Sequence, residues 1–103
     1  MKEAKRTALE AAGFRVGSVA EFLALTDAEN EMVELRVALA ALVRDLRTKL
    51  HVTQAELAAR MGSDQARISR LERNEPSVSV DQMLEAAFTL GARRKDIIEA
   101  IAA

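Results

Sequence analysis

Leucines recur along residues 27 to 50 at intervals of three and four. The stripe consists of Leu35, Leu39, Leu42, Leu46 and Leu50, with Met32 and Val43 beside it. Because this spacing places side chains on one face of a helix, it predicts a long helix over about 27 to 50 with its apolar face in a core. A coiled-coil seam against a partner is the alternative, although the repeat spans only about three heptads.

Helix starts are marked by Ser or Thr followed three residues later by Glu or Gln, each time before an apolar periodic stretch. The pairs are Ser18/Glu21, Thr26/Glu29, Thr53/Glu56 and Ser79/Gln82. In such a capping box the hydroxyl accepts a hydrogen bond from an unpaired amide of the first turn, and the Glu or Gln side chain accepts one from the cap amide. Together the pairs make a consistent set of helix starts.

Glycines and one asparagine mark the helix ends. Gly13, Gly62 and Gly91 each follow a helical pattern, and after Asn74 the chain reaches Pro76, which prevents the helix from resuming. Gly, and less readily Asn, adopts the positive φ that commonly ends a helix. Starts and ends together predict helices over about 3 to 12, 19 to 25, 27 to 50, 54 to 61, 63 to 73, 80 to 90 and 93 to 102.

Composition agrees with an all-helical chain. Hydrophobic residues make up 50% of the 103 residues but aromatic ones only 3%, with four glycines and one proline. The core is therefore expected to be aliphatic, because residues that favour helices outnumber those that favour strands. The length predicts a single domain with at most a short appendage.

Several classes of protein are not expected from the residues present. Cysteine is absent, which excludes disulfides and thiol chemistry, and His51 is the only histidine, so no second imidazole can share a metal with it. No serine has a base oriented by a third group, and no glycine-rich phosphate loop occurs. The N-terminus has no unbroken apolar run. We therefore expect a cytoplasmic protein without catalytic site, metal, cofactor or membrane partner.

Charge gives two different indications. The whole chain has 15 basic against 16 acidic residues, a net charge of -1, which argues mildly against nucleic acid as a partner. Residues 44 to 75, however, contain seven basic and five acidic residues, whereas residues 1 to 43 contain five basic and seven acidic ones. Any nucleic-acid contact is therefore expected within 44 to 75, and a single copy should bind weakly.

Residues 53 to 73 read TQAELAARMGSDQARISRLER, two short helices separated by a tight turn. Leu57, Ala58 and Met61 make one buried face of the first helix, and Ile68 and Leu71 make that of the second. A small residue such as Ala58 suits two helices that cross closely.

This segment resembles the helix-turn-helix of the Cro/CI-type (XRE) regulators, the lambda-repressor-like domains. Gln54, Ala58, Gly62, Ile68 and Leu71 lie at the spacings of that family, and the resemblance covers roughly residues 31 to 91. It implies an all-α domain of about five helices over 27–103, with the helix-turn-helix at 53–73 and a short helical N-terminal extension at 1–26. It also implies a homodimeric repressor that reads a palindromic site in double-stranded DNA through the helix 63–73 in the major groove.

Glu72 is predicted to face the interior. On a wheel of about 100° per residue with Ile68 inward, Glu72 lies about 40° to one side. A buried carboxylate is costly unless paired, and in the resembled family an Arg near the end of the first core helix pairs with this Glu. Arg47 occupies the matching place. The alternative is a half-exposed Glu72 without a fixed partner.

The outward face of the second helix carries the candidate contacts to bases. The wheel places on that face, or beside it, Ser63, Ala66, Arg67, Ser69, Arg70 and Arg73. Gln65 can pair with adenine, Arg70 with guanine, and the methyl group of Ala66 can touch that of thymine.

Phosphate contacts are expected at helix starts and in the following loop. Gln54 and Ser63 lie at helix N-termini, where amides carry partial positive charge. The resemblance implies that Arg73, Asn74 and Ser77 also approach the DNA backbone.

Asp64 departs from the family, which more often has an uncharged polar residue there. Its carboxylate would repel phosphates unless it accepts a hydrogen bond from a cytosine amino group or caps its own helix. Capping is favoured, because Asp is among the preferred N-cap residues.

Both ends of the chain are candidates for protein contacts. The extension either packs back onto the long helix or forms a dimer or toxin-binding surface, through Phe14, Val16, Val19, Phe22, Leu23 and Leu25. Such an extension also resembles that of HigA-type antitoxins, which neutralise a small ribonuclease toxin and repress their own operon; an antitoxin is therefore the alternative function. The C-terminal helix, with Ile97, Ile98 and Ile101, is the other candidate for dimerisation.

Overall fold

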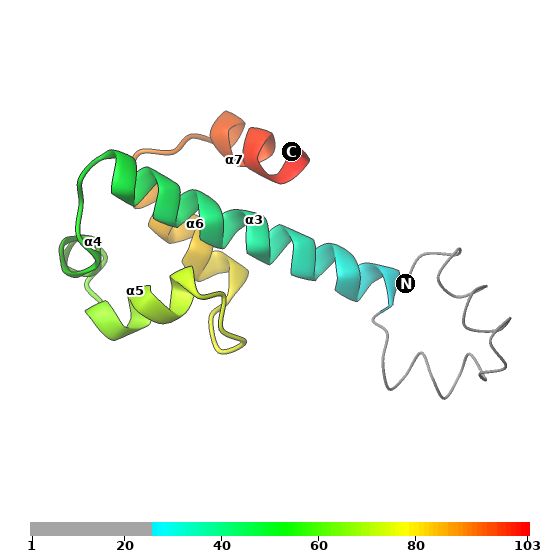
Figure 1. The fold of residues 1–103 in the computed structure, drawn as a ribbon, viewed down its shortest axis with the longest axis horizontal. Helices are drawn as coiled ribbons and strands as arrows, with labels where there is room; N and C mark the ends of the chain where they lie inside the picture. Colours follow the sequence, from blue (N-terminus) through cyan, green and yellow to red (C-terminus); the bar gives the residue numbers. More distant parts are fainter. Residues whose placement is uncertain (1–25) are drawn as a thin grey trace, which may run out of the picture. The chain divides into compact units, whose positions relative to one another are not determined.

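The structure, a computed structural model, describes residues 26 to 103 of the chain. These residues form α3 (Asp27–Lys49), α4 (Gln54–Arg60), α5 (Gln65–Glu72), α6 (Val80–Thr89) and α7 (Arg94–Ala102) (Figure 1). No strand occurs within residues 26 to 103, and the predicted all-α fold is confirmed. The helices expected over 3 to 12 and 19 to 25, the end at Gly13, the Ser18/Glu21 box and the apolar residues of the extension lie outside the described residues.

The observed helix bounds agree with the predicted ones to within two residues. The largest difference is at α5, which begins at Gln65 rather than at 63. Asp64 is the N-cap of this helix, with an extended backbone of φ -124° and ψ 161°, so the residues before it cannot be helical.

Two predicted capping boxes are complete. Before α4, Thr53 Oγ1 accepts a hydrogen bond from the Glu56 amide at 3.0 Å, and Glu56 Oε1 accepts one from the Thr53 amide at 3.4 Å. Before α6, Ser79 Oγ accepts a hydrogen bond from the backbone amide of Gln82 at 3.1 Å, and Gln82 Oε1 accepts one from the backbone amide of Ser79 at 2.8 Å. Local side-chain hydrogen bonds therefore begin both helices.

Residues Leu35–Ala103 form one compact unit, and the described residues 26 to 34 belong to an earlier one. In the described part of the earlier unit, residues 26 to 34, Thr26 Oγ1 accepts a hydrogen bond from the Glu29 amide at 3.1 Å, which is the hydroxyl half of the predicted box. Met32, expected beside the apolar stripe, is half exposed and is not a core residue.

The helices α3 to α6 each end at a residue with positive φ, namely His51 (57°), Gly62 (63°), Asn74 (55°) and Gly91 (99°). In all four cases the amide of that residue and the next amide donate to carbonyls of the last helical turn, the arrangement of a Schellman motif. The ends at glycine and asparagine were predicted from the sequence, whereas the end at His51 was not.

The end of α3 corrects one core prediction. Leu50, the last residue of the leucine stripe, is 49% exposed. His51 reverses the chain direction, and Val52 enters the core in place of Leu50. The Val52 amide donates to the Arg47 carbonyl at 2.9 Å, so the helix end itself positions the buried residue.

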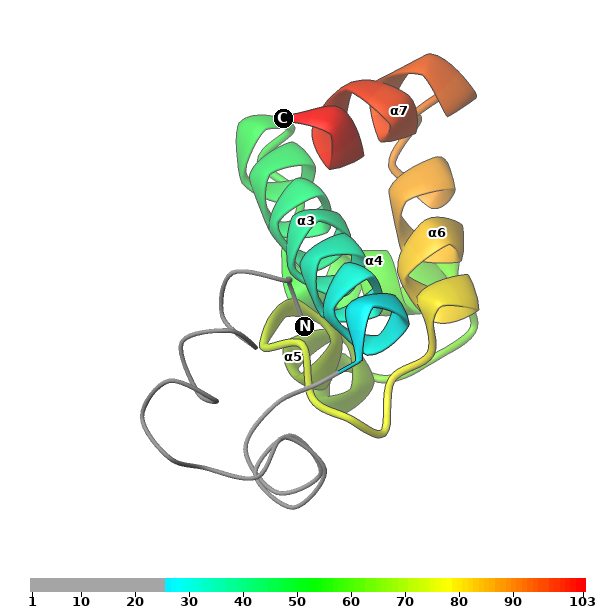
Figure 2. The same cartoon turned by 90° about the vertical axis from the view of Figure 1, so that its right-hand side faces the viewer.

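The core of the unit Leu35–Ala103 is aliphatic, as predicted. Its largest fully buried side chains are Leu39, Val43, Leu57, Ile68 and Met83. Leu39 and Val43 of α3 belong to this core, and Leu35, Leu42 and Leu46 pack against it, so the core interpretation is confirmed for these residues of the leucine stripe. In both views α6 lies beside α3, and α5 and α7 lie at opposite sides of the unit (Figures 1 and 2).

Candidate nucleic-acid interface

The helices α4 and α5 pack against each other across a tight turn. The Ser63 amide donates to the Ala58 carbonyl at 2.8 Å and closes the turn, with Gly62 at a φ of 63°. No atom lies within 4 Å of the place that a Cβ on Gly62 would take, so glycine is favoured here by its backbone angle rather than by space. Ala58 is buried, and its single methyl group lets the two helices approach.

Asp64 caps α5. Its Oδ1 atom accepts a hydrogen bond from the Arg67 amide at 2.9 Å. Of the two interpretations of this carboxylate, the structure therefore shows the capping one. Capping leaves the negative charge at the start of the helix, where it interacts favourably with the helix dipole.

Arg47 and Glu72 form an ion pair that joins α3 to α5. Arg47 Nε donates to Glu72 Oε2 at 2.6 Å and Nη2 donates to Oε1 at 2.9 Å, while Nη1 donates to the Val52 carbonyl at 3.0 Å. The Glu72 side chain is only 5% exposed, so the half-exposed alternative is wrong. The hydrogen bond to Glu72 raises the pKa of Arg47 above its ordinary value, although burial opposes this shift.

Two glutamines extend this pair towards the surface. Gln54 Nε2 donates to Glu72 Oε1 at 3.2 Å, and Gln54 Oε1 accepts a long hydrogen bond of 3.5 Å from Gln65 Nε2. A carboxylate can only accept, so Glu72 determines which way the amide group of Gln54 is turned. Gln54 is half-buried and Gln65 is exposed, each as the first residue of its helix. The buried pair thus orients Gln54, whose Oε1 atom is turned towards Gln65.

The helix α5 has an apolar inner face and a polar outer one. Ile68 and Leu71 are buried, as predicted. On the outer side, four residues are exposed, namely Gln65, Ala66, Arg67 and Arg73. Three others are half-buried, namely Ser63, Ser69 and Arg70. A polar helix face of this kind on the surface is typical of a helix that enters the major groove of DNA.

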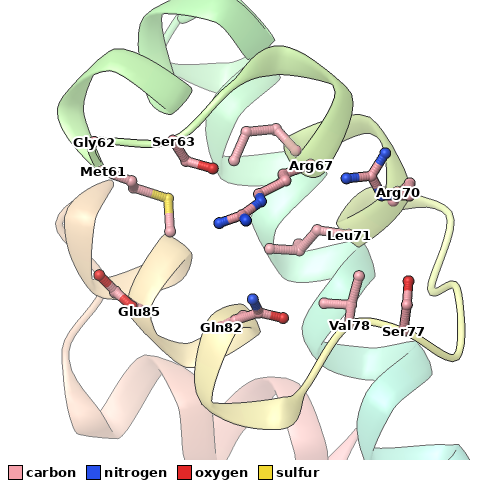
Figure 3. A pocket seen from close by; sticks show the side chains of 11 residues that line it. Met61, Gly62, Ser63, Arg67, Arg70, Leu71, Ser77, Val78, Gln82 and Glu85 are labelled. Atoms are coloured by element: carbon pink, nitrogen blue, oxygen red, sulfur yellow. The ribbon is translucent and has the colours of Figure 1, made fainter.

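A cavity of about 280 Å³ borders α5 on the side of α6 (Figure 3). Arg67 extends from α5 into it towards Gln82, and Arg70 and Ser77 lie at its other side. Within the described residues the guanidinium groups of Arg67 and Arg70 have no hydrogen-bond or ion-pair partner. Both are therefore available to an anionic ligand.

The loop after α5 is held by α3. Arg36 Nε donates to Asn74 Oδ1 at 3.2 Å, and Arg36 Nη2 donates to the Glu75 carbonyl at 2.9 Å. Arg73, a candidate phosphate contact, donates from Nη2 and Nε to Glu75 Oε2 at 2.6 and 2.9 Å. The sequence did not predict Arg36, because nothing local shows which residue of α3 faces this loop. Glu75, two residues after Arg73, was a local signal for an ion pair.

Membrane-spanning helices and metal-binding groups are both absent from residues 26 to 103. None of the helices there combines the length and the hydropathy needed to cross a bilayer. Nor do three or more His, Asp or Glu side chains in this part of the chain come together as a metal-binding group.

The part of the chain that forms helices α3 to α6 matches a family of known proteins. A family model described as "Helix-turn-helix domain" matches residues 22–95, which is most of the chain and includes α3 to α6. The curated proteins and the solved structures that were searched gave no significant match.

Proposed function

The chain belongs to the family of helix-turn-helix domains, and from this membership we propose that it is a sequence-specific regulator of transcription that binds double-stranded DNA through α5. A helix-turn-helix domain by itself indicates a DNA-binding regulator. The match is also consistent with the resemblance to Cro/CI-type regulators.

One observation carries the assignment of α5. Its first residue, Gln65, is connected through Gln54 to the buried pair of Glu72 and Arg47, by hydrogen bonds of 3.5, 3.2 and 2.6 Å in that order. A base-reading side chain has to be held in one orientation if it is to discriminate between bases. This network supports Gln65 as such a side chain.

The outer face of α5 has suitable chemistry for the major groove. Gln65 can form two hydrogen bonds to adenine, Arg70 can form two to guanine, and Ala66 can pack its methyl group against that of thymine. The guanidinium group of Arg70 has no partner among the described residues, which supports its assignment as a contact to guanine.

We assign backbone contacts to the residues around this face. Gln54 and Ser63, at the starts of α4 and of the turn into α5, would approach one phosphate each, and Arg67, Ser69, Arg73 and Asn74 would approach the phosphates beside α5. Asp64 lies in the same surface, but its carboxylate is engaged as a cap. Its remaining charge would lower the affinity of one copy for DNA.

A homodimeric repressor of a palindromic operator is the specific form we propose. One unit presents one recognition helix, whereas two copies would place two such helices in successive major grooves about 34 Å apart. The helix α7 supports a contact between copies, because Ile98 is 62% exposed and Ile101 43% exposed, while Ile97 is buried. An exposed apolar pair of this kind is often covered by a partner.

The proposed activity is binding in the cytoplasm, without a catalytic step. The antitoxin alternative rests on the apolar residues of the extension, from Phe14 to Leu25, which lie outside the described residues. Co-purification with a small ribonuclease would favour this alternative over a regulator that acts alone.

A gel-shift series tests the proposal. The protein is titrated against its own upstream region and against random DNA of equal length, at several salt concentrations. We expect Gln65→Ala and Arg70→Ala to weaken operator binding by about 1–3 kcal/mol, with relaxed preference at one base pair per half-site. Lys95→Ala, an exposed change on α7, is the control. Equal losses on operator and random DNA would contradict the assignment of base contacts.

A further inference from the structure

We propose that Glu75 is a latch on the DNA interface: by holding Arg73 in an ion pair, it withholds one cation from the phosphate backbone and so sets the affinity for DNA. This inference rests on the function proposed above. It concerns a residue to which neither the family match nor the wheel of α5 gives a role.

Three arginines follow one another at intervals of about one turn along α5 and its end. Arg67, Arg70 and Arg73 are three residues apart, so each lies next to the one before it on the helix surface. The first two have no partner for their guanidinium groups among the described residues, whereas Arg73 donates twice to one oxygen of Glu75, at 2.6 and 2.9 Å. Glu75 therefore neutralises only the last of the three.

The backbone holds Glu75 in place for this contact. Its amide donates to the Arg70 carbonyl at 3.1 Å as part of the Schellman turn at Asn74, and its carbonyl accepts a hydrogen bond from Arg36 Nη2 at 2.9 Å. Both bonds use main-chain atoms, so the carboxylate is not needed to shape the loop. The side chain of Glu75 is free to act on Arg73 alone.

Solvent exposure keeps the ion pair weak enough to be opened. The side chains of Arg73 and Glu75 are 62% and 37% exposed, and exposed pairs contribute little to stability. A phosphate can thus compete for Arg73, but it then lies next to the displaced carboxylate. The latch should lower the affinity for DNA by a modest factor rather than prevent binding.

The test compares four proteins in DNA titrations over a salt series: the natural chain, Glu75→Gln, Arg73→Gln and the double variant. We expect Glu75→Gln to lower Kd about three- to fivefold at low salt. The slope of log K against log salt should become steeper by about 0.9, because one more phosphate is neutralised. In the Arg73→Gln background the same change should alter Kd less than about twofold, because no guanidinium is left to release and only the general effect of the lost charge remains.

Glu85→Gln is the matched control. Glu85 is an exposed carboxylate on α6 that borders the cavity beside α5, and it has no side-chain partner among the described residues. The substitution Glu85→Gln removes the same charge without releasing an arginine, so Kd should change less than about twofold. Thermal denaturation should show the same midpoint for Glu75→Gln as for the natural chain, because the bonds that shape the loop remain.

Two results would overturn the latch: an equal gain in affinity for Glu75→Gln and Glu85→Gln, or a gain from Glu75→Gln that is as large in the Arg73→Gln background as in the natural chain. Either result would leave the proposed function standing as long as the natural chain binds its upstream DNA. Failure of the natural chain to bind any DNA would instead refute the proposed function, and the latch with it.

Discussion

Replacing Arg47 by methionine tests whether the buried ion pair holds α5 against α3. In Arg47→Met, Glu72 remains with a side chain that is 5% exposed and keeps Gln54 Nε2, at 3.2 Å, as its side-chain donor. Removing one partner of a buried pair costs about 3–5 kcal/mol, because the remaining charge is left unpaired. At about 0.05–0.15 kcal/mol per residue, a unit of this size has a free energy of unfolding of about 3–10 kcal/mol. The substitution should therefore remove a third or more of the total.

Thermal and urea denaturation followed by circular dichroism measure this loss. We expect the midpoint temperature of Arg47→Met to fall by at least about 12 °C, since a small domain loses about 4–8 °C per kcal/mol. Arg44→Met, an exposed arginine on the same helix, is the matched control and should change the free energy by less than about 0.5 kcal/mol. The double variant Arg47→Met/Glu72→Met should be more stable than Arg47→Met, because no charge is left buried.

A loss of less than about 1 kcal/mol for Arg47→Met, or a double variant less stable than both single ones, would refute the importance of the pair.

The pH at which stability is measured should matter little for Arg47, whose pKa is raised by its hydrogen bond to Glu72. A base whose pKa is raised on folding contributes its full stability below the unfolded value and loses it only as the pH rises through the folded value. Arg47 itself should therefore add no pH dependence between about pH 6 and 9.

Two substitutions at helix ends should have opposite effects on the free energy of unfolding, measured in urea. Gly62→Ala should lower the free energy of unfolding by about 1–2 kcal/mol, because a φ of 63° is unfavourable for alanine even though its Cβ would meet no atom within 4 Å. Gly62→Asn should lower it less, because asparagine tolerates positive φ better, and equal losses for the two variants would contradict this explanation. His51→Gly should stabilise by about 0.5–1 kcal/mol, because glycine adopts a φ of 57° more readily than histidine, and an unchanged midpoint would show that the strain at His51 is already relieved.

Local patterns in the sequence were enough to predict the described helices and the side of α5 that is buried. The boxes at Thr53 and Ser79 and the turn at Gly62 depend on hydrogen bonds and backbone angles within a few residues, so a local pattern was sufficient to find them. The inward direction of Glu72 followed from the helical period once Ile68 was placed in the core. Its pairing with Arg47 needed the resemblance to a known family as well.

The contacts between distant segments depend on how the helices pack against one another. Nothing local shows that Gln54 turns its amide towards Glu72, or that Arg36 reaches across 38 positions to Asn74. Each of these bonds exists because α3, α4 and α5 come together around one aliphatic core, and a shift of one helix by a single turn would break it. The same packing buries Val52 and exposes Leu50, although it is Leu50 that continues the apolar pattern of α3. Local sequence specified most of the described helix starts and ends, His51 being the exception, and the fit between helices specified which side chains lie behind the outer face of α5.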